Sequence, residues 1–401
     1  MYPQLSCTVH SDTFGTVGYL VIHNRVHGRA CGGVRLVPDI SLEEMRSAAR
    51  TMAYKSGFIG FPMGGAKAAI HMDDAREPYK EEILATFGQA LSSLIRTGAY
   101  LPGTDMNSTV EDLQSILQGA GRRQNLAPWK NRTHIYTAWS CFVSTLVALD
   151  TRGIEPRNAT FAVQGFGKVA SHYVRLMSGA GAKLVAVSNR RAALANGHGF
   201  DVDDLLKHRE TKQEACLAHY PHAERVTHAE VLEAPVTVLL PAARAWAIHE
   251  HNYQAIKAPI MICAANVAMD DDMERRLVEN GKIVIPDFVA NCGGLFGSVL
   301  DHEVKPTVIW HLLNTTYRQK IAHLLGRAEQ THEPISASAG NEAEHRMAAW
   351  SARQRSWPQR IGRKLRSVAP ERIRTKRHVR FYAQLWKVEN EKGEVDAKVS
   401  V

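Results

Sequence analysis

The sequence predicts an α/β protein with two domains, one of them a doubly wound parallel sheet, and a cleft between them. Three observations support this. Short apolar runs rich in β-branched residues alternate with helical patterns from about residue 133 to 305, as in parallel sheets covered by helices on both faces. The first 132 residues carry strands and amphipathic helices of their own. A chain of 401 residues, 45% of them hydrophobic, is long enough for two cores.

In the first part, alternation and capping signals define the elements in order. Ser41 and Glu44 have the spacing of a capping box, and Thr109 and Asp112 form a second cap pair. Gly57 is a stop signal for the helix that begins after Ser41. The predicted strands are 17–23 and 30–36, and the predicted helices are 41–57, 78–98 and 108–121.

In the second part, residues 158–191 predict a strand, a glycine turn, a helix and a strand. The turn "GFGKVA" (165–170) fits G-x-G-x-x-A in the context that its mechanism requires. Gly165 permits the tight turn, Gly167 lets backbone amides approach a pyrophosphate, and Ala170 allows close packing of the helix on the strand. We therefore expect a Rossmann-like dinucleotide-binding domain over residues 133–305. Further strands are predicted within 236–242, 259–266 and 282–287.

The end of the second strand bears on the choice between NAD and NADP. An NAD site usually has a carboxylate there, whereas this chain has Ser188, Asn189, Arg190 and Arg191. Two arginines in place of the acid favour the 2′-phosphate of NADP. The alternative is that both arginines lie on a solvated turn, and NAD then stays open.

Two lysines stand in otherwise apolar segments, Lys55 in "MAYKSG" and Lys67 in "FPMGGAKAAI". Lysine is rarely buried, so both amines either reach solvent or meet an anion. Two lysines in a dry cleft lower each other's pKa, and desolvation lowers it further. One of them is then able to exchange a proton near neutral pH.

These segments are part of an ordered set of motifs. The set is "GGVR" (32–35), "MAYKSG" (52–57), "FPMGGAKAAI" (61–70), "GTDMNSTVEDL" (103–113), "TAWS" (137–140), "VQGFGKVA" (163–170), "PAA" (241–243), "AAN" (264–266) and "DFVANCGGL" (287–295). In this order and spacing the chain resembles the dehydrogenases that act on glutamate, leucine, phenylalanine and valine. The resemblance covers roughly residues 15–305.

The resemblance implies reversible NAD(P)-dependent oxidative deamination of an L-amino acid to a 2-oxo acid and ammonia. It implies that Lys67 and Asp105 are catalytic, with Asp105 as the base for the substrate amine, and that Lys55 holds the α-carboxylate. It also implies that 1–132 is a substrate and oligomerisation domain of a homo-oligomer. The other implied substrate residues are Cys31, Gly33, Gly64, Gly65, Gly103, Leu295 and Ser298. The implied cofactor residues are Gly165, Phe166, Gly167, Lys168, Val169, Ala170, Ser188, Asn189, Arg190, Thr137, Ala242, Asn266 and Asn291.

The residue before "GGVR" bears on the substrate. Glutamate-specific members have a lysine there, which reads the side-chain carboxylate, and this chain has Cys31. Ser298 offers one hydrogen bond, which does not replace an ion pair. Together with Gly103 and Leu295, this pocket favours an aliphatic or aromatic amino acid. Glutamate, with another basic residue replacing the lysine, is the alternative.

The C-terminal part departs from the family pattern. Residues 306–335 are expected to form a helix that packs back on the substrate domain, followed by a basic extension over 336–401. "SASAGNEAE" within that extension predicts a linker, and residues 353–380 hold eleven basic residues against one acidic residue, Glu371. We expect a solvated or oligomer-contact segment, so that deleting 340–401 leaves turnover intact. The rival is a non-catalytic protein on a dehydrogenase scaffold whose basic tail binds an anionic partner such as nucleic acid.

The remaining features of the sequence argue against secreted, membrane-spanning and zinc-binding proteins. The start of the chain does not resemble a signal peptide, and no apolar stretch approaches the ~18 residues of a membrane helix. The six cysteines have no zinc-ligand spacing and fit reduced thiols in a cytosol. We therefore expect a cytoplasmic enzyme without a metal.

Overall fold

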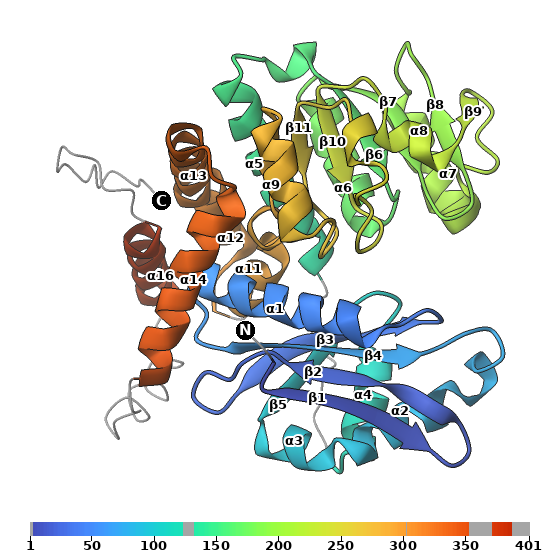
Figure 1. Ribbon diagram of the computed structural model, residues 1–401, viewed down its shortest axis with the longest axis vertical. Coiled ribbons are helices and arrows are strands. Elements are labelled where there is room, and N and C mark those ends of the chain that lie inside the picture. The colour runs from blue at the N-terminus through green and yellow to red at the C-terminus, as the bar shows by residue number, and fades with distance from the viewer. Residues whose placement is uncertain (1–2, 123–131, 302, 353–370, 387–401) are drawn as a thin grey trace.

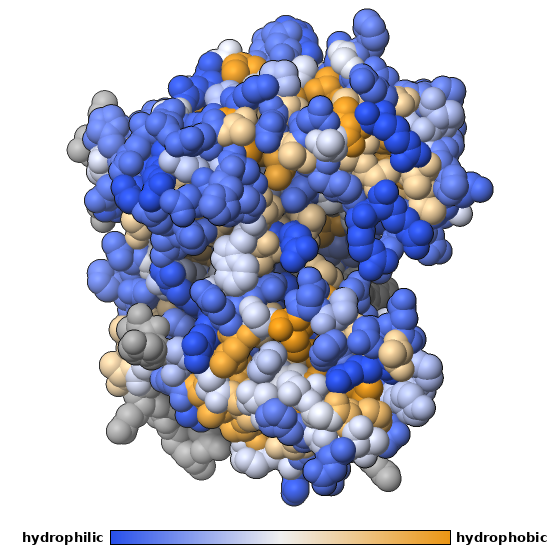
Figure 2. Space-filling model, turned by 45° about the vertical axis from the view of Figure 1, so that its right-hand side comes forward, coloured by the Kyte–Doolittle hydropathy of each residue, from blue (hydrophilic) through white to orange (hydrophobic). Residues whose placement is uncertain are grey.

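The structure, a computed structural model, describes residues 3–122, 132–301, 303–352 and 371–386. Two lobes are stacked on each other, and the helices at the C-terminal end lie along one side of both (Figure 1). The space-filling view shows a hollow between the lobes at the right-hand edge (Figure 2). The predicted α/β class with two sheets is confirmed.

The first lobe contains a five-stranded sheet in the order β1-β2-β4-β3-β5. Strand β2 runs antiparallel to both of its neighbours, β1 and β4, whereas β4, β3 and β5 run parallel. The sequence analysis missed β1, whose residues alternate without a strong apolar face. The strands are β1 (Leu5–Ser11), β2 (Gly15–Ile22), β3 (Ala30–Val37), β4 (Gly64–His71) and β5 (Tyr100–Thr104).

Helices cover both faces of this sheet. The helix α1 (Leu42–Phe58) packs on the face toward the second lobe, whereas α2 (Lys80–Ala90), α3 (Ser92–Thr97) and α4 (Val110–Gly119) lie on the other side (Figure 1). The capping box of Thr109 and Asp112 is confirmed. Gly57 does not stop α1, which continues to Phe58, and the single helix predicted over 78–98 is broken at Leu91.

The second lobe contains a seven-stranded sheet in the order β12-β11-β10-β6-β7-β8-β9, in which the first five strands are parallel. The chain passes from β6 to β7 on one side and later to β10 on the other, so the strand order reverses at β6, where doubly wound sheets bind ligands. The strands are β6 (Thr160–Gln164), β7 (Lys183–Ser188), β8 (Ala193–Ala195), β9 (Glu224–Val226), β10 (Val238–Pro241), β11 (Ile260–Ile262) and β12 (Ile283–Ile285).

Helices flank this sheet on both faces, as the alternation predicted. They are α5 (Thr133–Thr151), α6 (Lys168–Gly179), α7 (Val202–Lys212), α8 (His228–Leu232), α9 (Asp271–Glu279), α10 (Asp287–Ala290) and α11 (Gly293–Leu300). The predicted order strand, turn, helix, strand over 158–191 is β6, the glycine loop, α6 and β7.

The C-terminal helices differ from the expectation. The segment expected to return to the substrate domain forms α12 (Pro306–Leu312), a π-helical turn η5 (Leu313–Tyr317) and α13 (Arg318–Thr331), and η5 and α13 pack against α5. The helix that packs on α1 is α14 (Ile335–Ala352), so the linker predicted for "SASAGNEAE" is wrong. A last helix, α16 (Glu371–Leu385), follows, and most of the basic stretch 353–380 lies outside the described residues.

Candidate active site

Parallel pairing of β3 with both β4 and β5 brings three charged side chains of the first lobe together. Arg35 lies on β3, Lys67 on β4, and Asp105 directly follows β5. The Oδ2 of Asp105 lies 2.8 Å from Lys67 Nζ and 3.1 Å from Arg35 Nε, and Arg35 also pairs with Glu44. Lys67 therefore lies within a buried strand.

Burial and charge set the protonation of this cluster. Burial lowers the pKa of Lys67 to about 8, with Asp105 opposing the shift and Arg35 adding to it. The pKa of Asp105 lies well below its usual range, because the attraction of Lys67 and Arg35 outweighs the effect of burial. Lys67 is 1% exposed, whereas the Asp105 side chain keeps 19% of its surface accessible. The cluster therefore presents a carboxylate and an amine that can exchange a proton near neutral pH.

Lys55, in the last turn of α1, reaches across to the second lobe. Its Nζ donates to Asn266 Oδ1 over 3.1 Å, and Asn291 Nδ2 donates to the same oxygen over 3.0 Å. Burial lowers the pKa of Lys55. Three predicted site residues from two domains thus meet at one oxygen, between the substrate and the dinucleotide-binding lobes.

Asp287, at the start of α10, supports this contact and was not singled out from the sequence. Its carboxylate accepts hydrogen bonds from the backbone amides of Val267 and Phe288 over 2.6 and 2.7 Å. Val267 has a φ of +55°, which is strained for a β-branched residue, and the bond to Asp287 holds it there. Asp287 thereby fixes the loop that carries Asn266.

Three of the glycines that were expected to border the substrate lie in close packing contacts. A Cβ at Gly33 would lie 2.7 Å from Asp105 Cβ, so this glycine allows Asp105 its place. A Cβ at Gly64 would lie 2.1 Å from the carbonyl oxygen of Asn24, and one at Gly65 would lie 2.2 Å from the amide nitrogen of Ala53. The structure therefore assigns Gly64 and Gly65 to close packing of β4, where the sequence analysis expected an approach to the substrate.

Four residues were predicted to line the pocket for the side chain of the substrate. Burial raises the pKa of the Cys31 thiol to about 12, so Cys31 is not a thiolate nucleophile. A Cβ at Gly103 would have no heavy atom within 4 Å. Leu295 is partly buried on α11, and Ser298 Oγ donates to the carbonyl oxygen of Gly294 over 2.8 Å. The donor of Ser298 is therefore already used within its own helix.

The glycine loop has the geometry that a dinucleotide needs. Gly165 has a φ of +99°, and a Cβ there would lie 2.7 Å from the backbone of Ala243. Gly167 precedes α6 with open space beside it, and no side chain caps that helix, so its first amides face outward. The buried Oδ1 of Asn291 and Oε1 of Gln164 have no hydrogen-bond partner among the described residues. These residues fit a dinucleotide with its pyrophosphate at α6.

Several other predicted cofactor residues lie in or beside this loop, whereas Thr137 lies on α5. The carbonyl oxygen of Ser188 accepts from the amides of Gly165 and Phe166 over 2.8 Å each. The Ala242 amide donates to the carbonyl oxygen of Gln164, and Thr137 Oγ1 donates to that of Thr133. Lys168, Val169 and Ala170 form the first turn of α6, where Ala170 is buried.

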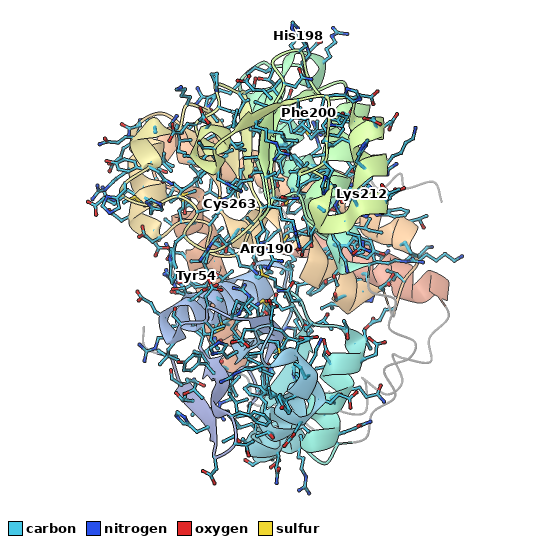
Figure 3. All side chains as sticks on the ribbon, turned by 90° about the vertical axis from the view of Figure 1, so that its right-hand side faces the viewer. Tyr54, Arg190, His198, Phe200, Lys212 and Cys263 are labelled. Atoms are coloured by element: carbon cyan, nitrogen blue, oxygen red, sulfur yellow. The ribbon has the colours of Figure 1, made fainter. Side chains whose placement is uncertain are left out.

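At the end of β7, the side chain of Asn189 forms hydrogen bonds with backbone groups of the turn and its surroundings. Its Oδ1 accepts from the amides of Arg191 and Ala192, and its Nδ2 donates to the carbonyl oxygen of Glu214. Arg190 is exposed and forms an ion pair with Glu214 over 2.8 Å. It lies toward the end of the second lobe that faces the first (Figure 3).

Arg35 and Arg209 were missed as site residues. Arg209 Nε donates to the carbonyl oxygen of Phe166 over 3.2 Å, which places a cation at the dinucleotide loop. No local signal marks Arg209, which stands on a polar helix 42 positions after Gly167. Arg35 stands within "GGVR", so its place in that motif was an available signal.

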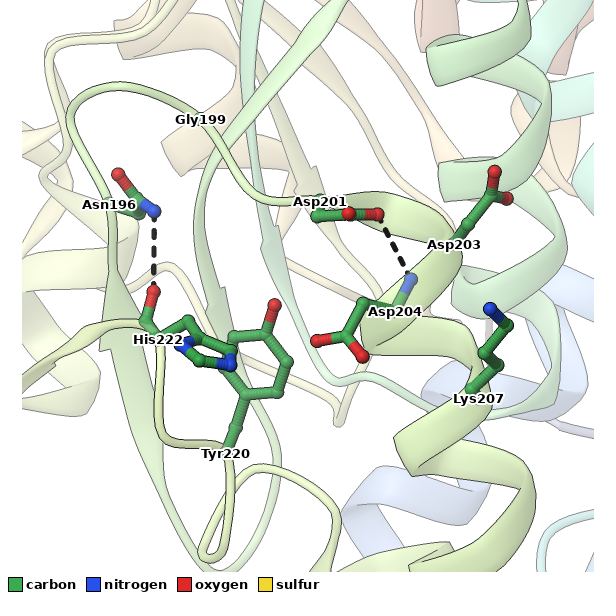
Figure 4. Close-up of a pocket in the computed structure, with 8 residues that line it drawn as sticks. All are labelled: Asn196, Gly199, Asp201, Asp203, Asp204, Lys207, Tyr220 and His222. Atoms are coloured by element: carbon green, nitrogen blue, oxygen red, sulfur yellow. Dashed lines mark hydrogen bonds between the residues drawn. The ribbon is translucent and has the colours of Figure 1, made fainter.

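A separate hollow of 670 Å³ lies beside α7, lined by three aspartates with Asn196, Gly199, Lys207, Tyr220 and His222 (Figure 4). Asp201 accepts from the amide of Asp204, so this acid serves as a helix cap. Over the described part of the chain, no group of three or more potential metal ligands comes together, and no helix is long and apolar enough to cross a membrane.

Comparison with known proteins covers both lobes. The model of the glutamate/leucine/phenylalanine/valine dehydrogenase family matches residues 131–350, and the model of the dimerisation domain of Glu/Leu/Phe/Val dehydrogenases matches residues 4–120. A glutamate dehydrogenase of Thermotoga maritima is 33% identical over 302 residues, which are 71% of each chain.

Two solved structures share the fold. The leucine-bound hetero-hexameric glutamate dehydrogenase of Thermus thermophilus matches with a TM-score of 0.72 at 22% identity, over 92% of this chain and 91% of that one. The L-tryptophan dehydrogenase of Nostoc punctiforme matches with a TM-score of 0.60 at 21% identity, over 87% of this chain and 96% of that one.

Proposed function

The chain belongs to the glutamate/leucine/phenylalanine/valine dehydrogenase family and is an amino-acid dehydrogenase, and on this premise we propose that it reversibly deaminates an L-amino acid to a 2-oxo acid and ammonia with NAD(P). The observation that carries the proposal is the Asp105 carboxylate between Lys67 and Arg35, on the lobe whose Lys55 contacts Asn266 of the other lobe.

Lys55 holds the substrate by its α-carboxylate. Lys55 is 6% exposed, and its amine donates a hydrogen bond to the neutral amide oxygen of Asn266. A carboxylate is a stronger acceptor for an ammonium group than an amide, so substrate binding compensates the desolvation of Lys55. Asn266 and Asn291 then remain beside the nicotinamide end of the cofactor.

Asp105 and Lys67 handle the protons. Asp105 attracts the substrate ammonium group and takes its proton. Because the pKa of Asp105 is low, the proton then passes to water, which reaches the accessible part of the carboxylate. A bound nicotinamide supplies the acceptor for the hydride that leaves Cα. The neutral amine of Lys67 takes a proton from the water that attacks the resulting imine, and the ammonium form returns it to the departing ammonia. Arg35 lowers the pKa of Asp105 and so favours the return of Asp105 to its ionised form before the next turnover.

This role of Lys67 predicts the pH dependence of the reaction. We expect kcat/KM for deamination to rise with pH through an apparent pKa of about 8. Burial lowers the pKa of Lys67 to this value, so the amine becomes neutral, as the mechanism requires, above it. The measurement is a pH profile with two amino acids whose own amino groups differ in pKa. A rising limb that stays in place for both substrates belongs to the enzyme. A limb that follows the substrate, or a flat profile, contradicts the assignment.

For the side chain we propose an aliphatic or aromatic residue. The Cys31 thiol stays neutral, Ser298 already donates within α11, and Gly103 leaves open space. A second carboxylate would be desolvated there with little compensation. Glutamate is the second candidate, favoured by the name of the Thermotoga maritima relative and by Arg29, whose charge acts on Cys31.

For the cofactor we propose that NADP is accepted. No carboxylate occupies 188–191, and the guanidinium of Arg190 is exposed, with Glu214 as its partner. A 2′-phosphate can replace Glu214 as the partner of Arg190. The family relationship also supports a homo-oligomer built through the lobe of residues 4–120.

The test is to follow nicotinamide absorbance with a panel of common L-amino acids, using NAD and NADP separately. Reduction with leucine, phenylalanine or tryptophan but not with glutamate is the expected result. Reduction with glutamate alone overturns the proposed pocket. No reduction in either direction, together with strongly salt-dependent binding of nucleic acid, favours the rival non-catalytic function.

A further inference from the structure

The last turn of α1 carries Lys55, and its end is covered by the two C-terminal helices. The final carbonyls of a helix lack partners within it and need donors from elsewhere. Arg346 Nη1, on α14, donates to the carbonyl oxygens of Gly57 and Phe58 over 3.2 Å each. Trp386, just after α16, donates from its indole Nε1 to the same Phe58 oxygen over 3.0 Å. These bonds give α1 a C-terminal cap from more than 280 positions away in the sequence.

Packing around the cap is close. A Cβ at Gly57 would lie 2.7 Å from the Cβ of Ala343, so α14 rests directly on the backbone of α1. Trp386 is 1% exposed, and its ring lies 6.2 Å from that of Phe58 and 5.2 Å from that of Phe296, measured between centroids. Trp386 therefore contacts both lobes where the chain leaves α1.

Arg346 is also bonded to the end of α16, and its charge is balanced by a carboxylate. Arg346 Nη2 donates to the carbonyl oxygen of Leu385 over 3.0 Å, which links α14 to the end of α16. The same nitrogen lies 3.3 Å from Glu342, whose carboxylate also pairs with Lys320. A cation at the C-terminal end of a helix interacts favourably with its dipole.

Lys55 depends on this turn. It precedes Gly57 by two residues, and its carbonyl oxygen accepts from the amide of Ile59, so the capped carbonyls and the Lys55 backbone belong to one turn. Its Nζ must also stay within hydrogen-bond reach of Asn266 in the other lobe. A shift of the turn moves the amine relative to the lobe that holds the cofactor.

We propose that Arg346 and Trp386 are positioning residues that fix Lys55 for the substrate carboxylate, so that the C-terminal helices complete the substrate site. The inference rests on the proposed function of Lys55. It places residues that the sequence assigned to an accessory tail within the machinery of amino-acid binding.

The test compares three variants in the full chain. Arg346→Met removes the guanidinium donors, and Trp386→Phe removes the indole N–H and keeps a packed ring. Arg318→Met, an arginine on α13 that pairs with Asp150 at the surface, is the matched control. For each variant, KM is measured for the amino acid and for the cofactor, with thermal unfolding alongside. In the same samples, reductive methylation is followed at Lys55 and Lys67 by peptide mass spectrometry.

We expect KM for the amino acid to rise roughly tenfold in both variants, with KM for the cofactor unchanged, because a displaced amine loses orientation toward the carboxylate. Methylation of Lys55 is expected to become faster than in the wild type, with Lys67 and the control unaffected. Unchanged KM and unchanged labelling in both variants, even with lowered thermal stability, would overturn the inference. If the wild type has no amino-acid turnover at all, the proposed function fails, and labelling of Lys55 alone decides whether Arg346 and Trp386 hold the turn.

Discussion

Replacing Asp105 by asparagine is expected to lower kcat roughly 10²- to 10⁴-fold while the cofactor still binds. The amide has the shape of the carboxylate but does not take the proton of the substrate amine. It also leaves Lys67 Nζ and Arg35 Nε, which lie 2.8 and 3.1 Å from Asp105 Oδ2, without the negative charge between them. Both the acceptor and the electrostatic balance of the site are lost.

The measurement is steady-state turnover combined with titration of cofactor fluorescence. Asp203→Asn is the matched control, because Asp203 is an exposed aspartate beside the hollow at α7. Thermal unfolding shows whether a loss of turnover results from a loss of folded protein. Turnover of Asp105→Asn at the wild-type rate would contradict the assignment of Asp105 as the proton acceptor.

Ending the chain after residue 339 is expected to prevent stable folding, contrary to the expectation from the sequence. The deletion removes most of α14 together with α16, and with them Tyr382 and Trp386, which are 3% and 1% exposed. Loss of one buried tryptophan side chain typically costs about 3–5 kcal/mol. That is a large part of the ~5–15 kcal/mol by which domains are stable. The aromatic rings of Phe58, Phe296 and Tyr317 would lose their cover.

Soluble yield and thermal unfolding measure this effect. The matched control is the double variant Lys376→Gln, Arg380→Gln in the full chain, which removes two exposed charges of α16 and keeps its buried aromatic residues. We expect the control to unfold at the wild-type temperature. A shortened chain as stable and as active as the wild type would show that α14 and α16 are accessory after all.

Local patterns in the sequence were sufficient to predict those elements whose structure depends on neighbouring residues along the chain. The capping box at Thr109 follows from spacing, because its hydrogen bonds close within three residues. The passage β6, loop, α6, β7 follows from the order of apolar runs and glycines. The motif order likewise singled out Lys55, Asn266 and Asn291, which meet at one oxygen, and Lys67 and Asp105, which form an ion pair. The last three predicted strands of the second lobe contain β10, β11 and β12, although the run 259–266 extends four residues beyond Ile262.

Local patterns did not predict the structure of segments that depend on contacts with distant parts of the chain. The strand β1 is stabilised by pairing with β2, and its own sequence has no strong apolar face. The helix α14 is rich in small residues that look like a linker, and it is helical where those residues allow close packing on Gly57. The close packing of β4 that Gly64 and Gly65 allow is likewise not visible in its own sequence.

By itself, the sequence determined the family and the two sheets, and it singled out the candidate reactive groups, since these depend on residue type and order. Only the tertiary structure decided how the groups are coupled. Arg35 meets Asp105 across 70 positions and Trp386 meets Phe58 across 328, and no local pattern encodes such pairs. Charge and burial at those contacts set the pKa of Lys67 and the support of Lys55, because electrostatic and packing energies depend on distance in space.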